Sequence, residues 1–258
     1  MNSCLVTAVC VTHKINKHLY RALISVSRQS ESLKLLLIFD GIVPDKSFLS
    51  WLEKVFPGDR VTLHTREHMG LTKQLNWAVR QVKTDWFARI DSDDAWCKYK
   101  IKNQLNVVDK LDSKLTIIGT KKALEYPCKP QERHTSTFRQ INILQLLKAN
   151  PLLHSSVLLN TRNFIISGQY DSSYKYTQDY EAWLRVLKCG FSVAIIDAEL
   201  TYIDQDCKER ISIAKSREQT WYELKAFCAH YPLIKLFSPS FYIRFLRLVA
   251  RIILGRRL

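Results

Sequence analysis

Short apolar runs alternate with amphipathic helical patterns through the first 100 residues. The apolar runs predict buried strands, and segments whose apolar residues recur three or four positions apart predict helices. The predicted strands are Leu5–Val11, Leu35–Phe39, Arg60–Thr65 and Trp86–Ile90, and the predicted helices are Lys17–Ser27, Phe48–Val55 and Leu71–Val82. Alternation of this kind indicates an α/β fold with a mainly parallel central sheet covered by helices.

The pattern is less regular after residue 100. It predicts strands over Thr116–Gly119, Ser155–Asn160 and Ser192–Ile196, and helices over Ile141–Lys148 and Tyr180–Lys188. The polar stretches Lys129–Thr137 and Asp204–Arg217 are expected to be loops, and two helices close the chain.

Composition supports a folded domain without a membrane span. Hydrophobic residues make up 47% of the 258, enough for a sizeable core. The seven cysteines are scattered and contain no C-x-x-C pair, which argues against a disulfide framework and a cysteine zinc site and favours a reduced cytosol. We expect no signal peptide, and no stretch reaches the roughly 18 uncharged apolar residues of a membrane span.

The chain is strongly basic. Its 39 Lys and Arg against 24 Asp and Glu give a formal net charge of +15. Such a charge favours polyanions: phosphates, nucleic acid or an anionic membrane surface. No zinc finger, RNA-binding signature or basic run with interleaved aromatics precedes the last 20 residues, so nucleic acid is not the expected partner.

Acidic residues gather where a predicted strand ends. Asp91, Asp93 and Asp94 directly follow Trp86–Ile90, and Asp40 follows another predicted strand. Carboxylates this close repel one another, and a cation such as Mg²⁺ or Mn²⁺ would offset the repulsion. Ligands of open parallel sheets bind beyond the carboxyl ends of the strands. A solvated acidic turn is the alternative.

Six short blocks occur in one order between residue 5 and about residue 190. They are Val9-Cys-Val-Thr-His13, Ile38-Phe-Asp-Gly41, Gly70-Leu-Thr-Lys-Gln-Leu-Asn76, Asp91-Ser-Asp-Asp94, Asn150-Pro-Leu-Leu-His154 and Gln178-Asp-Tyr-Glu-Ala-Trp-Leu-Arg185. Together they resemble glycosyltransferase family 2, a group of inverting enzymes with the GT-A nucleotide-sugar-binding fold. The resemblance implies a GT-A-like α/β fold and a metal-dependent glycosyltransferase.

The same resemblance implies roles on the donor side. Asp93 would bind Mn²⁺ or Mg²⁺, and Asp91 would contact the ribose or the metal through water. Asp40 would accept a hydrogen bond from the base, which favours uracil and a UDP-sugar. Lys73 would pair with a phosphate, and Thr12 lies where the opening strand leads into the donor loop. A turn residue at Asp40 and a solvated helix lysine at Lys73 are the alternatives.

On the acceptor side, the resemblance makes Asp179 the base that deprotonates the acceptor hydroxyl. A helix start favours the ionised form that a base requires, although an Asp in a first turn stabilises any helix. Glu181 is the rival, two residues further along. His154 is a candidate contact to the acceptor or a phosphate, with a structural hydrogen-bonding role as the alternative.

The last helix is basic and amphipathic. Arg244, Arg247 and Arg251 fall on one side, and aromatic and aliphatic residues fill the rest. Such a helix suits an anionic membrane surface, with a packing helix as the alternative. Many members of the family that the chain resembles use lipid-linked acceptors in bacterial surface-polysaccharide assembly. This implies a lipid-linked glycan acceptor and a peripheral location at the cytoplasmic face of the inner membrane.

The expected organisation is therefore a GT-A-like catalytic domain over residues 1–215, with a donor half (1–100) and an acceptor half (101–215), followed by a helical C-terminal region (216–258). Three other function classes remain open. A nucleotidyltransferase would use strand-end carboxylates in the same way. A basic nucleic-acid-binding protein and a non-catalytic membrane scaffold explain the charge but not the carboxylates.

Overall fold

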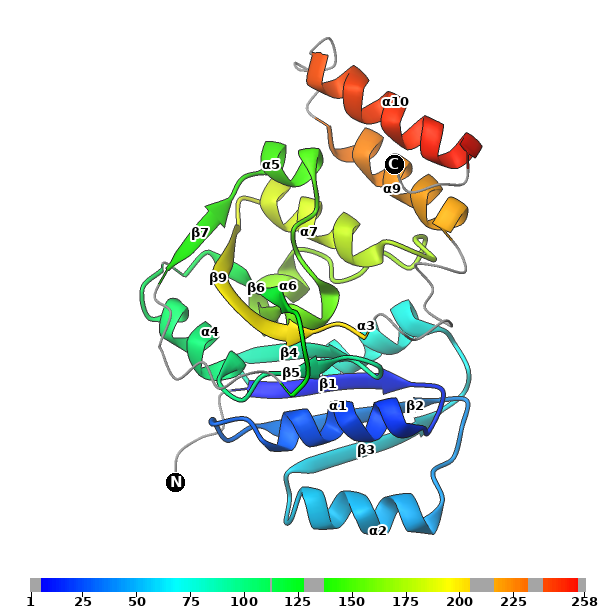
Figure 1. Ribbon diagram of the computed structural model, residues 1–258, viewed down its shortest axis with the longest axis vertical. Coiled ribbons are helices and arrows are strands. Elements are labelled where there is room, and N and C mark those ends of the chain that lie inside the picture. The colour runs from blue at the N-terminus through cyan, green and yellow to red at the C-terminus, as the bar shows by residue number, and fades with distance from the viewer. Residues whose placement is uncertain (1–5, 112, 128–136, 205–215, 232–238, 255–258) are drawn as a thin grey trace.

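The computed structural model describes residues 6–111, 113–127, 137–204, 216–231 and 239–254. They form an α/β fold around one nine-stranded sheet, with two helices, α9 and α10, at the end remote from α2 (Figure 1). Most of the two predicted loops, Lys129–Thr137 and Asp204–Arg217, lies outside the described residues.

The sheet has the order β3-β2-β1-β4-β8-β6-β9-β5, and β7 pairs with β9. The strands are β1 (Val6–Thr12), β2 (Lys34–Asp40), β3 (Val61–Arg66), β4 (Trp86–Asp91), β5 (Ala95–Trp96), β6 (Leu115–Ala123), β7 (Phe138–Ile141), β8 (Leu158–Asn160) and β9 (Ser192–Tyr202). Neighbours among β3, β2, β1 and β4 are parallel, whereas β8 runs antiparallel to β4 and β6. The predicted mainly parallel α/β fold is confirmed.

The helices begin where side chains satisfy free backbone N–H groups. Asn16 accepts hydrogen bonds from the first turn of α1, and Asp45 does the same for α2. The helices are α1 (Lys17–Ser27), α2 (Lys46–Val55), α3 (Leu71–Gln81), α4 (Lys100–Val108), α5 (Ile143–Lys148), α6 (Thr161–Ile166), α7 (Gln178–Lys188), α9 (Ser216–His230) and α10 (Pro239–Leu254).

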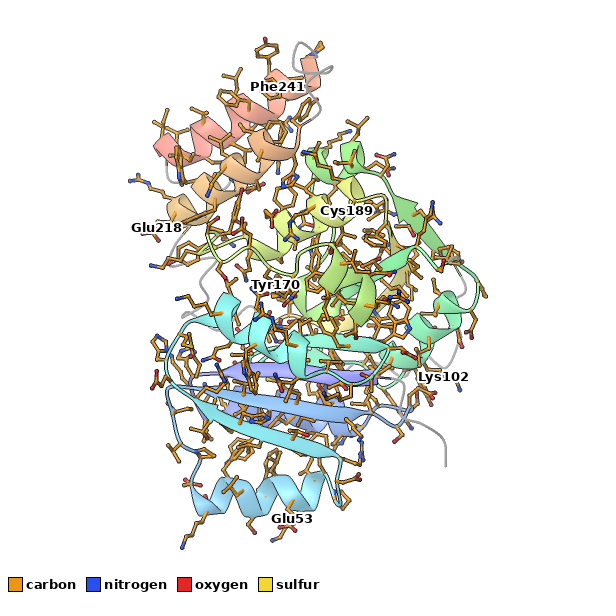
Figure 2. The ribbon with its side chains drawn as sticks, turned by 180° about the vertical axis from the view of Figure 1, so that it is seen from behind. Glu53, Lys102, Tyr170, Cys189, Glu218 and Phe241 are labelled. Carbon is orange, nitrogen blue, oxygen red and sulfur yellow. The ribbon has the colours of Figure 1, made fainter. Side chains whose placement is uncertain are left out.

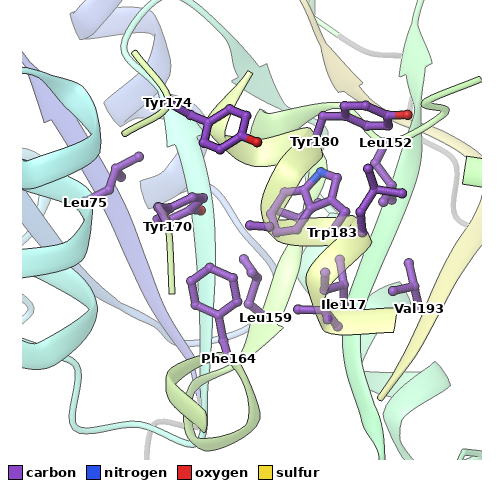
Figure 3. Close-up of a cluster of buried hydrophobic side chains, with 14 of the residues drawn as sticks. Leu75, Ile117, Leu152, Leu159, Phe164, Tyr170, Tyr174, Tyr180, Trp183 and Val193 are labelled. Atoms are coloured by element: carbon purple, nitrogen blue, oxygen red, sulfur yellow. The ribbon is translucent and has the colours of Figure 1, made fainter. Parts of the chain in front are cut away.

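Alternating residues of β1 enter two separate cores, one on each face of the sheet. Ala8 and Cys10 pack with α1 and α2, while Val9 and Val11 pack with α3 and α7. Figure 3 shows the second core around Trp183, with Phe164 and Tyr170 beside it. A strand buried on both faces explains why β1 reads as a continuous apolar run.

The structure differs from the predicted strand over Ser155–Asn160. Residues His154–Ser156 form a 3₁₀ turn, and β8 begins only at Leu158. The Ser156 hydroxyl donates to the Leu153 carbonyl at 2.8 Å, and such a local bond competes with strand pairing. The pattern also missed α4, whose buried face contains Lys100 and two amides and so lacks an apolar stripe.

The C-terminal helices pack on each other as a pair beside α7 (Figure 1). Figure 2 shows Phe241 and Glu218 on this pair, far from Glu53 on α2. Arg244 and Arg251 of α10 both pair with Glu223 of α9, whereas Arg247 is exposed. The three arginines therefore do not form the single basic outer face expected from helical spacing, because α9 supplies an acidic partner. Among the described helices, none is long and apolar enough to cross a membrane.

The cysteines differ from expectation at one position. Cys10, Cys189 and Cys228 are free thiols, whereas Cys97 is disulfide-bonded. Scattered spacing gave no sign of this bond, because the fold and not the sequence separation decides which sulfurs meet.

Candidate active site

Three of the predicted donor residues share one edge of the sheet. Thr12, Asp40 and Asp91 end the parallel strands β1, β2 and β4, and Val11 pairs with Asp91 across the β1–β4 ladder. Because parallel strands end at the same edge, the ladder brings together residues that are far apart in sequence. Asp93 follows in the turn after β4.

Thr12 is buried and closes the turn after β1. Its Oγ1 donates to the Lys14 carbonyl at 2.6 Å and accepts from the Lys14 N–H at 3.2 Å. Its side chain thus shapes the loop that leaves β1.

Asp40 is 5% exposed and its carboxylate holds the loop that leads into α3. Oδ1 accepts from the Met69 N–H at 2.8 Å and the Gln74 side chain at 2.7 Å, and Oδ2 accepts from the Gly70 N–H at 3.2 Å. His68 Nδ1 lies 3.0 Å from Oδ2, and the His68 side chain is 74% exposed. A carboxylate accepts about four hydrogen bonds, so these contacts fill Asp40, and His68 is the partner that a ligand can displace most easily.

Asp91 is held on both oxygens. Arg89 donates to Oδ1, and the Ser155 hydroxyl lies 2.9 Å from Oδ2. Ser155 Oγ also accepts the Asp91 N–H at 3.0 Å and lies 2.5 Å from Oδ2 of Asp94, which is buried. The acidic turn is therefore an ordered part of the site and not a freely solvated one.

Asp93 belongs to the same turn, and its backbone carbonyl accepts a hydrogen bond from Arg21. Arg21 also pairs with the buried Asp204 at 2.5 Å, which joins the turn to the end of β9. In the described ranges, no group of three or more His, Cys, Asp or Glu side chains could hold a metal ion. One or two carboxylates completed by substrate phosphates are the arrangement that Mg²⁺ and Mn²⁺ commonly use, and the turn can supply them.

The start of α7 carries two carboxylates in different situations. Asp179 is half-buried and has no hydrogen-bond or ion-pair partner among the described residues. Glu181 is 3% exposed, pairs with Arg185 at 2.9 Å and lies 3.2 Å from His230. Burial raises the pKa of Glu181, but the hydrogen bonds from His230 and Arg185 outweigh it and lower the pKa below its ordinary value.

Thr177 precedes α7 in a left-handed backbone conformation with φ of 58°. Left-handed geometry at a residue with a branched Cβ is strained, and strained residues cluster at functional sites. It sets the direction in which the chain enters α7, and so the position of Asp179.

His154 lies between the strand edge and α7. Its Nε2 is 3.1 Å from the Tyr170 hydroxyl. Burial lowers the pKa of His154, and the charges of Asp91, Arg89 and Asp179 also act on it. The imidazole is therefore neutral near pH 7, and Asp91 and Asp179 both lie within electrostatic reach of it.

Lys73 is exposed in the first turn of α3, the helix whose N-terminal loop Asp40 holds. It has no hydrogen-bond or ion-pair partner in the described part of the chain. Its position suits a phosphate contact and equally a solvated lysine.

The motifs did not identify Arg89, Ser155 or Asn76 as parts of this network. Asn76 exchanges two hydrogen bonds with the backbone of Tyr170, at 2.7 and 3.0 Å, which fixes the tyrosine beside His154. Arg89 had a visible signal, because it is a lone charge inside an otherwise apolar strand. Ser155 had none, since its importance depends on how the 3₁₀ turn meets β4.

Relatives with curated names match half of the chain or more. An uncharacterized glycosyltransferase of Rickettsia typhi is 30% identical over 139 residues, which cover 51% of this chain and 43% of that protein. The amylovoran biosynthesis glycosyltransferase AmsE of Erwinia amylovora is 24% identical over 165 residues, covering 62% of this chain and 60% of AmsE. The chain thus spans about half the length of the Rickettsia protein.

Solved structures with the same fold cover nearly the whole chain. S. aureus TarS residues 1–349 in complex with UDP-GlcNAc superimposes with a TM-score of 0.70 at 15% identity, covering 95% of this chain and 72% of that one. The mannosyltransferase PcManGT of Pyrobaculum calidifontis in complex with GDP-Man and Mn²⁺ gives 0.63 at 11% identity, covering 98% and 88%. At such low identity the likeness shows the fold.

The profile described as "Glycosyl transferase family 2" matches residues 7–159, which include β1, β2, the acidic turn after β4 and His154. The match covers more than half of the chain and the whole strand edge described above. The chain belongs to glycosyl transferase family 2.

Proposed function

We propose that the chain is an inverting, metal-dependent glycosyltransferase that takes a sugar from a UDP-sugar. The observation that carries the proposal is that two kinds of carboxylate act electrostatically on the buried His154: the held Asp91 at the strand edge and the unpaired Asp179 at the start of α7. The held Asp91 suits binding of the donor, and the unpaired Asp179 suits transfer of a proton.

Asp179 is the proposed base. Its carboxylate accepts the proton of the acceptor hydroxyl while the oxygen attacks the anomeric carbon from the face opposite the diphosphate. The bond between the anomeric carbon and the diphosphate oxygen breaks in the same step, so the anomeric configuration inverts. Glu181 is the weaker candidate, because Arg185 and His230 already use its oxygens.

Asp93 is the proposed metal ligand, with Asp91 beside it. When bound, Mn²⁺ or Mg²⁺ would neutralise the diphosphate and stabilise the departing nucleoside diphosphate. Lys73 would add a second positive charge on the side of α3, and the loop shaped by Thr12 would border the donor.

Asp40 is proposed to contact the uracil base. Its lone pairs are filled by the chain itself, so a uracil N–H would take the place of His68 on Oδ2. The solved structures of similar fold contain UDP-GlcNAc in one case and GDP-Man in the other, so the choice of UDP rests on Asp40 and not on the fold.

The acceptor is proposed to be a lipid-linked glycan in bacterial surface-polysaccharide synthesis, at the cytoplasmic face of the inner membrane. Support comes from the similarity to AmsE, whose name places it in amylovoran biosynthesis. The division into a catalytic domain (1–215) and a C-terminal helical region (216–258) belongs to the same proposal.

Membrane contact is proposed through the outer face of α10. Five large residues there are between 48% and 69% exposed: Tyr242, Ile243, Leu246, Ile253 and Leu254. Arg247 lies exposed among them, and the opposite face packs on α9 through Phe241 and Phe245. An exposed apolar stripe with a cation fits the interface of an anionic bilayer.

The test is release of nucleoside diphosphate from UDP- and GDP-sugars without acceptor, with Mn²⁺, Mg²⁺ or a chelator. We expect hydrolysis of at least one UDP-sugar that stops in chelator. Preference for a GDP-sugar would overturn the Asp40 assignment, and full turnover in chelator would overturn the metal. Transfer of a nucleotidyl group instead of a sugar would establish the nucleotidyltransferase alternative.

A further inference from the structure

Arg89 places a guanidinium in the middle of the central strand β4. It is 1% exposed, pairs with Val9 of β1 in the ladder, and donates its N–H to the Val157 carbonyl on the other side at 3.1 Å. Burying a charge costs several kcal/mol unless it is paired, so an arginine at this position requires a specific partner. The rest of β4 before Asp91 is apolar.

The partner is Asp91, two residues along the same strand. Residues i and i+2 of a strand point to the same face, so the guanidinium reaches Oδ1 directly, and Nη1 reaches the Val9 carbonyl at 3.4 Å. Nε has no hydrogen-bond partner in the structure described. Arg89 thus donates its side-chain hydrogen bonds to one carboxylate oxygen and one backbone carbonyl.

Ser155 occupies the other side of the same carboxylate. Its Oγ accepts the Asp91 N–H at 3.0 Å, and its single proton is shared between Asp91 Oδ2 at 2.9 Å and Asp94 Oδ2 at 2.5 Å. The two donors come from different elements, β4 and the 3₁₀ turn at His154–Ser156. Rotation of the Asp91 carboxylate would break both contacts, although Asp91 itself remains 30% exposed.

We propose that Arg89 and Ser155 are positioning residues that fix Asp91 as an acceptor for hydroxyl groups of the nucleoside diphosphate and leave the metal ion to Asp93. The inference rests on the proposed function. A metal cation on Asp91 would lie close to the buried guanidinium, and the repulsion between the two charges opposes direct ligation there. A neutral sugar hydroxyl meets no such repulsion.

The test is a double-mutant cycle read out by UDP binding in titration calorimetry. Asp91→Asn and Arg89→Met are each expected to weaken UDP binding about tenfold in saturating Mn²⁺, the usual loss for a hydrogen bond to a charged group. The double variant should be no weaker than Asp91→Asn alone, because Arg89 acts through Asp91. Additive losses, or unchanged affinity in Arg89→Met, would overturn the positioning role.

Metal dependence supplies the second readout. The Mn²⁺ concentration that half-saturates UDP binding should rise in Asp93→Asn and stay at the wild-type value in Arg89→Met and Asp91→Asn. A rise in Asp91→Asn as large as that in Asp93→Asn would make Asp91 a direct ligand and contradict the proposal.

Ser155→Ala covers the case in which Arg89→Met does not fold. It removes one hydroxyl and should weaken UDP binding about threefold to tenfold. This hydroxyl contacts Asp94 as well as Asp91, so the affinity of the single variant is the readout. Unchanged UDP binding in Ser155→Ala would overturn the positioning role of Ser155. Absence of UDP binding by the wild-type protein would overturn the proposed function together with this inference, whereas wild-type binding with an additive cycle would overturn the inference alone.

Discussion

The strand edge and the start of α7 both bring carboxylates to the candidate site, but these carboxylates differ in their hydrogen-bond partners. At the strand edge, Asp40 and Asp91 are held on both oxygens by donors of the protein. At α7, Asp179 has no such partner among the described residues, while Glu181 next to it is fully paired. The strand edge therefore holds its carboxylates in fixed orientations, whereas the start of α7 leaves the Asp179 carboxylate without a protein partner.

A carboxylate that recognises a ligand gains from being fixed before the ligand arrives, because less order remains to be imposed on binding. A general base needs a lone pair for the proton that it takes. The contrast teaches that hydrogen-bond partners, more than sequence position, separate the proposed binding carboxylates from the proposed base.

The largest effect is expected at Asp93. Asp93→Asn keeps the shape of the side chain but removes the charge proposed to hold the metal, so transfer should fall by about 10³-fold or more. Initial rates across a Mn²⁺ titration measure the loss. Asp59→Asn, an exposed carboxylate before the amino end of β3, is the matched control and should keep wild-type rates. An active Asp93→Asn in chelator would break the donor side of the comparison.

The next effect tests the unpaired carboxylate. Asp179→Asn should slow transfer by about 10² or more, the scale of a lost general base, and leave the affinity for UDP unchanged. NMR of the glycoside should show the anomer opposite to that of the donor. A retained anomer would exclude single displacement, and a fully active variant would transfer the role to another group.

Glu181→Gln is the counterpart of that variant and sharpens the contrast within α7. Breaking a buried ion pair costs about 3–5 kcal/mol, so this variant should lose thermal stability and keep most of its activity per folded molecule. Differential scanning calorimetry beside the activity assay separates the two effects. Loss of activity with unchanged stability would reverse the assignment of Asp179 and Glu181.

The ion pair between Glu181 and Arg185 predicts that the stability of the protein depends on pH. The pKa of Glu181 is lowered in the folded protein, so its contribution to stability is present above its ordinary value near 4.5 and is lost as the pH falls through the lower folded value. The difference in melting temperature between wild type and Glu181→Gln should therefore be largest near neutral pH and shrink below about pH 4.5. A constant difference would mean that the ion pair is not its source.

A smaller effect is expected for the base contact. Asp40→Ala should weaken UDP binding more than tenfold, because hydrogen bonds to a charged group are worth about 1.5–3 kcal/mol. His68→Ala should keep or improve the affinity, since the imidazole competes for Asp40 Oδ2. Calorimetry with UDP and GDP measures both. Weaker binding in His68→Ala would show that the histidine itself contacts the nucleotide.

The smallest effect concerns the outer face of α10. Replacing Ile243 and Leu246 by Asp removes apolar burial of about 1 kcal/mol each, so sedimentation with anionic liposomes should fall by about tenfold or more. Leu124→Asp is the control, because Leu124 is 83% exposed outside the C-terminal helices. Equal sedimentation of the wild type, the Ile243/Leu246 double variant and Leu124→Asp would show that α10 is a packing helix and does not bind the membrane.

The sequence predicted the strands of the first 100 residues well because β1, β2 and β4 are buried and read as apolar runs. Their ends are marked by Asp40 and Asp91, so the apolar runs and the acids that follow them were enough to locate the strand edge. The family blocks also named Asp179 and His154, and in the fold the charges of Asp91 and Asp179 both act on His154.

Contacts between distant segments could not be predicted. The Ser155 hydroxyl meets Asp91 and Asp94 only because a 3₁₀ turn interrupts the expected strand. Helical spacing placed three arginines on one side of α10, but Glu223 on another helix decides that two of them face inward. Periodicity gives the face of a helix and says nothing of what lies against it.

The sheet order has a consequence for how the protein behaves at high concentration. Its path ends at β3 on one side and at β5, only two residues long, on the other. A long flat edge invites another chain to add a strand, and short or charged edges discourage this. On β3, the Arg66 guanidinium lies 4.0 Å from the centre of the Trp77 ring and donates a hydrogen bond to the Gln74 side chain. A charged group therefore lies at the end of that edge strand. The two-residue β5 and the charged end of β3 are therefore features that discourage strand addition at the two ends of this path.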